Sequence, residues 1–140
     1  AVSVARAARF FASPLYRRMT EADRLLREFP FAVDLPASAL APGASLPSDA
    51  AEIVIVQGIA DCVLEERGAL TVVDYKTDRV KTPAELIGRY RRQLGLYAQA
   101  LERILGMPVR ECLLYSFALG TAIDATAAAK QSIFEAAPHE

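Results

Sequence analysis

Asp74 and Lys76 lie two residues apart at the end of the apolar run 69–73. Such a run is typical of a buried strand, in which residues two apart point to the same face of the sheet. A second apolar run, further upstream, ends at Asp61. Buried acids and amines are costly unless they pair with each other or serve a function. Two carboxylates and a lysine at one edge of a sheet therefore indicate a divalent-metal site that cleaves phosphodiester bonds.

A β-hairpin is expected to bring the two aspartates together. The segments 52–65 and 70–76 are rich in apolar and β-branched residues, and Arg67-Gly68 suits a two-residue turn between them. This turn pairs Asp61 with Asp74, whose Cβ atoms would then lie about 4.5–5.5 Å apart. The hairpin strands are apolar on both faces, so we expect them to be central in the sheet and covered.

Two opposed carboxylates are unfavourable without a counter-charge, so one of Asp61 and Asp74 would hold its proton unless a cation lay between them. Hard carboxylate oxygens suit Mg²⁺, which also keeps water and takes substrate phosphate. Lys76, one pleat onward and opposite Ile59, would polarise the scissile phosphate or help to deprotonate the attacking water. The alternative is a buried network of these three charges that only satisfies itself.

The remaining elements complete an α/β fold. Alternation of helical and strand patterns in the order α-β-β-β-α-β predicts a mixed central sheet flanked by helices. The tail, 121–140, fits either an edge strand or a short helix. Besides the hairpin, the expected elements are a helix over 14–28, an extended segment over 29–33, a loop over 34–50, a helix over 83–105 that ends at Gly106, and a strand over 109–118.

Composition sets limits on the function. The chain has 140 residues, 53% of them hydrophobic, which is enough for one domain with a packed core. With 16 basic and 17 acidic residues it does not bind nucleic acid by bulk charge alone. No apolar run approaches the about 20 residues that span a bilayer, so no membrane is expected. Two cysteines are too few for a disulfide framework, and Cys62 is expected in the core.

The long helix carries a polar strip beside its apolar stripe. Gln93 and Tyr97 are four residues apart and share a face, and Arg89 lies one turn before Gln93. The strip either contacts a DNA phosphate and orients Lys76, or is an ordinary helix flank with a half-buried tyrosine. The expected core stripe consists of Leu86, Tyr90, Leu94, Leu101 and Leu105.

Three motifs in order resemble the RecB-like branch of the PD-(D/E)XK nucleases, and in particular the C-terminal nuclease domains of the AddA family of helicase-nucleases. They are G-I-x-D at 58–61, D-Y-K-T at 74–77 and Q-x-x-x-Y at 93–97. The segment 27–31, Arg-Glu-Phe-Pro-Phe, is similar to an R-E-x-P-F segment of those domains. The resemblance covers roughly residues 15 to 120, and it implies a restriction-endonuclease-like fold.

The resemblance also implies roles for single residues. Asp61 and Asp74 would be metal ligands, with the backbone carbonyl of Tyr75 as a further ligand, and Lys76 would be the catalytic lysine. The implied metal is Mg²⁺, for which Mn²⁺ can substitute. These domains usually have a metal-binding histidine in an early helix, whereas the only histidine here is His139. The residues expected to contact DNA or support the site are Gln93, Tyr97, Arg89, Thr77 and Glu28.

The implied setting is a larger protein. The chain begins at Ala1 without a methionine, and it carries no G-x-x-x-x-G-K-S/T motif, so ATP would be used only by a helicase part outside this sequence. We therefore expect 1–140 to be a single nuclease domain at the C-terminal end of a helicase-nuclease. Its partners would be DNA, mainly single-stranded, the helicase part of the same polypeptide and an AddB-like second subunit, in the bacterial cytoplasm at the nucleoid. The alternatives are a catalytically silent nuclease fold that docks or binds DNA, and a free-standing nuclease of the same superfamily.

Overall fold

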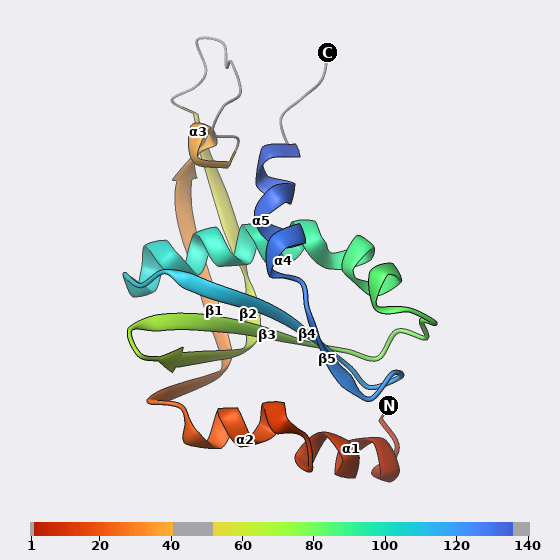
Figure 1. The fold of residues 1–140 in the computed structure, drawn as a ribbon. Coiled ribbons are helices and arrows are strands. Elements are labelled where there is room, and N and C mark those ends of the chain that lie inside the picture. Colours follow the sequence, from red (N-terminus) through yellow and green to blue (C-terminus); the bar gives the residue numbers. More distant parts are fainter. Residues whose placement is uncertain (1, 41–51, 136–140) are drawn as a thin grey trace.

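A mixed five-stranded sheet forms the middle layer of the molecule, with helices on both faces (Figure 1). The computed structural model describes residues 2–40 and 52–135. The strands lie in chain order across the sheet, and only the β3–β4 pair is parallel. The strands are β1 (Arg24–Pro36), β2 (Ile53–Glu66), β3 (Ala69–Lys76), β4 (Val109–Ser116) and β5 (Thr121–Asp124).

The helices divide between the two faces of the sheet. One face is covered by α4 (Pro83–Leu105) and α5 (Thr126–Glu135), and the other by α1 (Val4–Phe11) and α2 (Pro14–Glu21) (Figure 1). A single turn, α3 (Ala37–Leu40), follows β1. Because β3 and β4 are parallel, the chain must cross over between them, and α4 makes this crossing. The predicted mixed α/β fold, a sheet flanked by helices, is confirmed.

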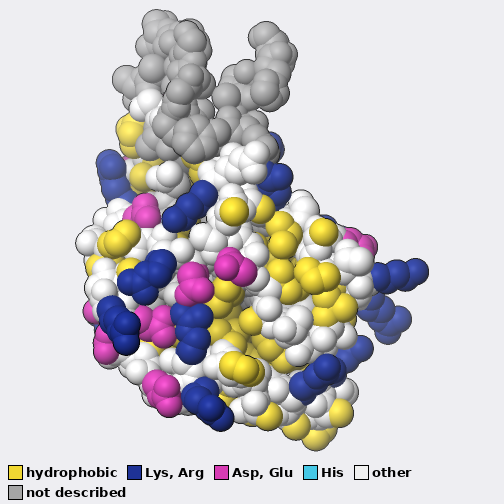
Figure 2. All heavy atoms as spheres, viewed as in Figure 1, with side chains coloured by type: hydrophobic (Ala, Val, Ile, Leu, Met, Phe, Trp, Pro, Cys, Tyr) yellow, Lys and Arg dark blue, Asp and Glu magenta, His cyan; other side chains and the backbone are white. Residues whose placement is uncertain are grey.

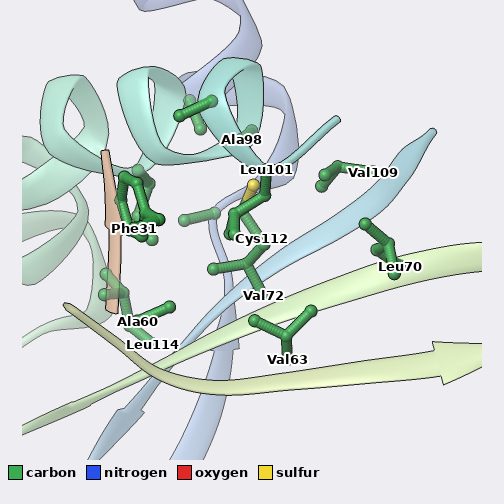
Figure 3. Close-up of a cluster of buried hydrophobic side chains, with 14 of the residues drawn as sticks. Phe31, Ala60, Val63, Leu70, Val72, Ala98, Leu101, Val109, Cys112 and Leu114 are labelled. Carbon is green, nitrogen blue, oxygen red and sulfur yellow. The ribbon is translucent and has the colours of Figure 1, made fainter. Parts of the chain in front are cut away.

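Each face of the sheet has its own hydrophobic core. On the α4 side, β-branched and leucine side chains of the sheet pack against Leu94, Ala98 and Leu101 of α4 (Figure 3). On the other side, Phe10, Leu15 and Met19 of the first two helices pack against the sheet residues Cys62, Leu64, Val73, Leu113 and Tyr115. Cys62 is fully buried, as predicted for a core residue.

The predicted helix over 14–28 is wrong in its second half. The helix α2 ends at Glu21, and Arg24 begins β1, which also contains the extended segment predicted over 29–33. Leu25 and Leu26 pack into opposite cores, on the two faces of the sheet. A strand that is apolar on both faces has the same close spacing of leucines as a helix, and its pairing with β2 decides between the two.

The ends of the chain hold more structure than the sequence patterns predict. The expected loop over 34–50 is wrong at its start, because residues 34–36 belong to β1 and 37–40 form α3; residues 41–51 lie outside the described part. The helix α1 is not predicted. The tail contains both of the elements considered for it, β5 and then α5, and His139 lies beyond the described residues. The described helices include none long and apolar enough to cross a membrane.

The β2–β3 hairpin has the predicted turn and register. Arg67 and Gly68 both have positive φ, 52° and 77°, as a two-residue type I′ turn requires. Glu66 pairs with Ala69, and the ladder continues in this register to the pair Cys62–Val73, where it ends. Beyond that pair β2 stays hydrogen-bonded only to β1.

The expected covering of the hairpin holds for β3 but not for all of β2. β3 is buried from Ala69 to Asp74. In the part of β2 that has left β3, one face is open to solvent: Ile53, Ile55 and Ile59 are exposed. The sheet is therefore forked, and Asp61 stands where the fork opens.

Candidate active site

The two aspartates and the lysine meet at the fork between β2 and β3. The Nζ atom of Lys76 lies 3.1 Å from Oδ2 of Asp74, and both side chains are largely buried, with 17% and 11% of their surfaces exposed. Asp61 lies directly beyond the last β2–β3 pair, and its Oδ2 accepts a hydrogen bond of 2.8 Å from the backbone N–H of Tyr75. The predicted backbone pairing of Asp61 with Asp74 is thus replaced by a side-chain contact one residue further along β3. The predicted place of Lys76 opposite Ile59 is not formed, because Lys76 pairs with Ser116 of β4.

Burial and the neighbouring carboxyl change the acidity of Asp74. Its pKa is raised from 3.8 to about 7, first by burial and then by a hydrogen bond with the Asp61 carboxyl, against the opposing effect of Lys76. The expected conflict between two close acids is therefore present. At neutral pH a cation that binds both carboxylates would compete directly with this proton.

The predicted polar strip of α4 reaches the acidic pair through one residue. The Nε2 atom of Gln93 lies 3.4 Å from Oδ2 of Asp74, the same oxygen that contacts Lys76. Arg89, one turn earlier, instead forms ion pairs with Asp78 at 3.0 Å and with Glu85 at 3.1 Å. Arg89 is therefore held away from the acidic pair, at the surface.

Tyr97 touches the strand that carries Asp61. A Cβ atom at Gly58 would lie 2.4 Å from the hydroxyl oxygen of Tyr97, so only glycine leaves room for this ring. The ring also packs edge-on against Phe31 of β1, with centroids 4.9 Å apart. The glycine of the first motif and the tyrosine of the third are thus direct neighbours, which fixes the end of β2 against α4.

Tyr90 holds Lys76 from the side opposite to Asp74. The Nζ atom of Lys76 lies 3.8 Å from the centre of the Tyr90 ring, a cation–π contact. The Tyr90 hydroxyl in turn donates a hydrogen bond of 2.8 Å to Oδ2 of Asp78. Sequence reasoning placed Tyr90 only in the core stripe, although it stands three residues before Gln93 and so shares its side of the helix.

Glu28 and Thr77 lie at the edges of the site. Glu28 stands level with Asp61, between the pairs Arg27–Cys62 and Phe29–Ala60, and its φ of 47° is unusual for a residue other than glycine. Both carboxylates line a groove of about 340 Å³ together with Arg27 and Tyr75. Thr77 is exposed directly after β3.

The donors suit a hard divalent cation. Among residues 2–40 and 52–135, no three His, Cys, Asp or Glu side chains gather closely enough to hold a metal ion by themselves. Mg²⁺ commonly takes one or two protein carboxylates and completes its shell with water and substrate phosphate. The adjoining carboxyls of Asp61 and Asp74 match that donor set, whereas a structural zinc site would need four protein ligands.

Comparison with known proteins identifies the class. The family model described as the PD-(D/E)XK nuclease superfamily matches residues 2–137, and the chain belongs to this superfamily. It is also similar to proteins named as A-type subunits of ATP-dependent helicase/nucleases. Identity is 43% over 124 residues with that of Desulforudis audaxviator, 40% over 125 residues with that of Pelotomaculum thermopropionicum and 39% over 109 residues with that of Desulforamulus reducens.

These alignments cover most of this chain and little of each relative. They include 87%, 88% and 77% of the chain, but 10%, 10% and 9% of the three relatives, respectively. The chain therefore spans about a tenth of the length of the curated relatives it matches. The predicted family resemblance is confirmed, and the relatives' names support a nuclease.

Proposed function

We propose that this chain is the nuclease domain of a DNA-repair helicase-nuclease, and that it hydrolyses phosphodiester bonds of single-stranded DNA with Mg²⁺, for which Mn²⁺ can substitute. The observation that carries the proposal is the contact between two carboxyls, Asp61 and Asp74, with Lys76 at 3.1 Å from the second. In the proposal Asp61, Asp74 and the backbone carbonyl of Tyr75 hold the metal.

The chain's own residues would divide the work of hydrolysis. A divalent cation in such a site supplies activation of the attacking water and stabilisation of negative charge on the phosphate. Lys76, fixed between Asp74 and the Tyr90 ring, presents its ammonium group to a phosphate oxygen. Gln93 orients the Asp74 carboxyl. Tyr97 keeps the end of β2 in place through Gly58.

The proposal extends to the whole protein. The helicase part of the same polypeptide would use ATP to separate the strands, and an AddB-like second subunit would complete the complex in the bacterial cytoplasm. The near-balanced charge of the chain supports this division, because delivery of the strand by a motor replaces strong electrostatic capture. Glu28 would support the site, and Thr77 and Arg89 would lie along the path of the strand.

One observation favours a second candidate, a catalytically silent nuclease fold that only binds DNA. In the described part of the chain two carboxylates, and no third metal-binding side chain, meet at the fork. A silent domain would bind the strand and leave it intact.

Cleavage of end-labelled single-stranded DNA in Mg²⁺, in Mn²⁺ and in EDTA tests the proposal. We expect metal-dependent cleavage that falls by about 100-fold or more in Lys76→Met, as for loss of one transition-state contact. Lys130→Met removes an exposed lysine of α5 and should cut like the wild type. Circular substrates would separate endonuclease from exonuclease activity. Binding without cleavage in either metal would instead support the silent fold.

A further inference from the structure

A groove of about 290 Å³ opens beside α1 and α2, and its walls are mainly aromatic. Its rings pack edge-on against one another: Phe11 and Tyr16 have centroids 5.0 Å apart, and Phe10 and Tyr75 have centroids 5.3 Å apart. The groove is lined chiefly by Phe10, Phe11, Tyr16, Arg27, Tyr75 and Phe117.

Phe10 and Phe11 have different surroundings. Phe10 is only 7% exposed and anchors α1 in the core, so it accounts for the packing of the helix. Phe11 is 58% exposed. Hydrophobic side chains show on the surface at the bottom of Figure 2, where α1 lies in the same view. An exposed ring at the mouth of an aromatic groove offers a free face on which a flat molecule can stack.

The aromatic groove adjoins the acidic site. Arg27 and Tyr75 line both this groove and the groove in front of Asp61. Tyr75 also donates its backbone N–H to Asp61. The Arg27 side chain is exposed and forms no ion pair with any residue of the described ranges. A cation thus stands between a site suited to a phosphate and a groove suited to a ring.

We propose that this groove binds a nucleobase of the single strand whose phosphate lies at Asp61, with the base against Phe11 and Tyr16 and with Arg27 on the phosphate backbone. The inference rests on the proposed function, because the strand is the substrate of that site. Only an unpaired base has a free face, so the groove selects single strands over duplex. Stacking tolerates any base, as a nuclease that follows a helicase requires.

Its size and charge favour this occupant over a segment of protein. A volume of about 290 Å³ lies at the lower limit of ligand pockets, which suits one planar ring better than a helix of a partner. The guanidinium of Arg27 matches the phosphate that accompanies every base.

Binding of labelled oligonucleotides to the 140-residue chain tests the inference. Fluorescence anisotropy in Ca²⁺, with a gel to show that the strand stays intact, gives the Kd for normal single-stranded DNA and for an abasic strand of equal length. Phe11→Ala should raise the Kd of the normal strand about tenfold and leave that of the abasic strand unchanged. Phe11→Tyr keeps a ring and should bind like the wild type. Val4→Ala, an exposed position of α1 outside the groove, is the matched control.

Three results would overturn the inference: equal Kd values for Phe11→Ala and Val4→Ala, equal weakening of the normal and abasic strands, or no binding of single strands by the wild type. Circular dichroism checks that the Phe11 variants stay folded, as their exposed position predicts. Because the readout is binding, it separates the two proposals. Cleavage with no effect of Phe11→Ala refutes the groove alone, whereas a base-dependent effect without cleavage supports the groove and refutes the nuclease.

Discussion

Asp74→Asn should change how the stability of the metal-free protein depends on pH. The pKa of Asp74 rises from 3.8 to about 7 because of burial and the Asp61 carboxyl. The difference, 7 minus 3.8, is about 3, which corresponds to about 4 kcal/mol at about 1.36 kcal/mol for each pH unit. Below about pH 4 the folded and unfolded forms both carry the proton. Between about pH 4 and about pH 7 only the folded form does, so stability falls as pH rises, and above about pH 7 the whole amount is lost.

Asparagine cannot lose a proton, so the variant should lack this slope. Urea unfolding followed by circular dichroism in EDTA measures it. The free energy of unfolding of Asp74→Asn should gain on the wild type by about 3 kcal/mol between about pH 5 and about pH 8. Asp34→Asn, at an exposed position of β1, controls for the lost charge. Parallel pH curves for the wild type and Asp74→Asn would refute the reasoning, since Asp74 would then ionise as readily in the folded protein as in the unfolded chain.

Three further outcomes follow from the site. Tyr90→Leu removes the ring beneath Lys76 and should lower kcat about 2- to 30-fold, whereas Tyr90→Phe keeps the ring and should stay within a few-fold of the wild type; equal losses in a single-strand cleavage assay would exclude the cation–π contact as the cause. Gly58→Ala should cost about 1–3 kcal/mol in a denaturant titration, with part of the loss recovered by adding Tyr97→Phe, and an unchanged midpoint would contradict the close contact. The affinity for Mn²⁺ by calorimetry should rise up to about tenfold per pH unit below about pH 7 and level off above it, because the metal displaces the proton on Asp74; a pH-independent affinity would show that it does not.

Local chemistry explains why parts of the fold could be predicted. The turn at Arg67-Gly68 needs two residues with positive φ, a requirement that glycine at the second position meets readily. The helix α4 has its signals at both ends: the Thr82 hydroxyl accepts the N–H of Glu85, and Gly106 closes it with a φ of 71°. These signals lie within a few residues of what they determine.

The mistakes came from features that depend on distant segments. The pattern of Leu25 and Leu26 fits a helix and a doubly buried strand equally well, and pairing with β2 decides it. The same limit applies to the site. Asp61, Asp74 and Lys76 could be found because one hairpin holds all three. The contact of Tyr90 with Lys76 joins α4 to β3, and no local pattern marks it.

The position of a bound metal tests the central claim most directly. Crystals of the chain soaked in Mn²⁺ would be measured at the manganese absorption edge, and the ion located from its anomalous scattering. The account predicts one strong peak within coordination distance of the carboxylates of both Asp61 and Asp74, and its loss in Asp74→Asn. A peak elsewhere, or none at the fork in a crystal with the site open to solvent, would contradict a metal-dependent nuclease site at these residues.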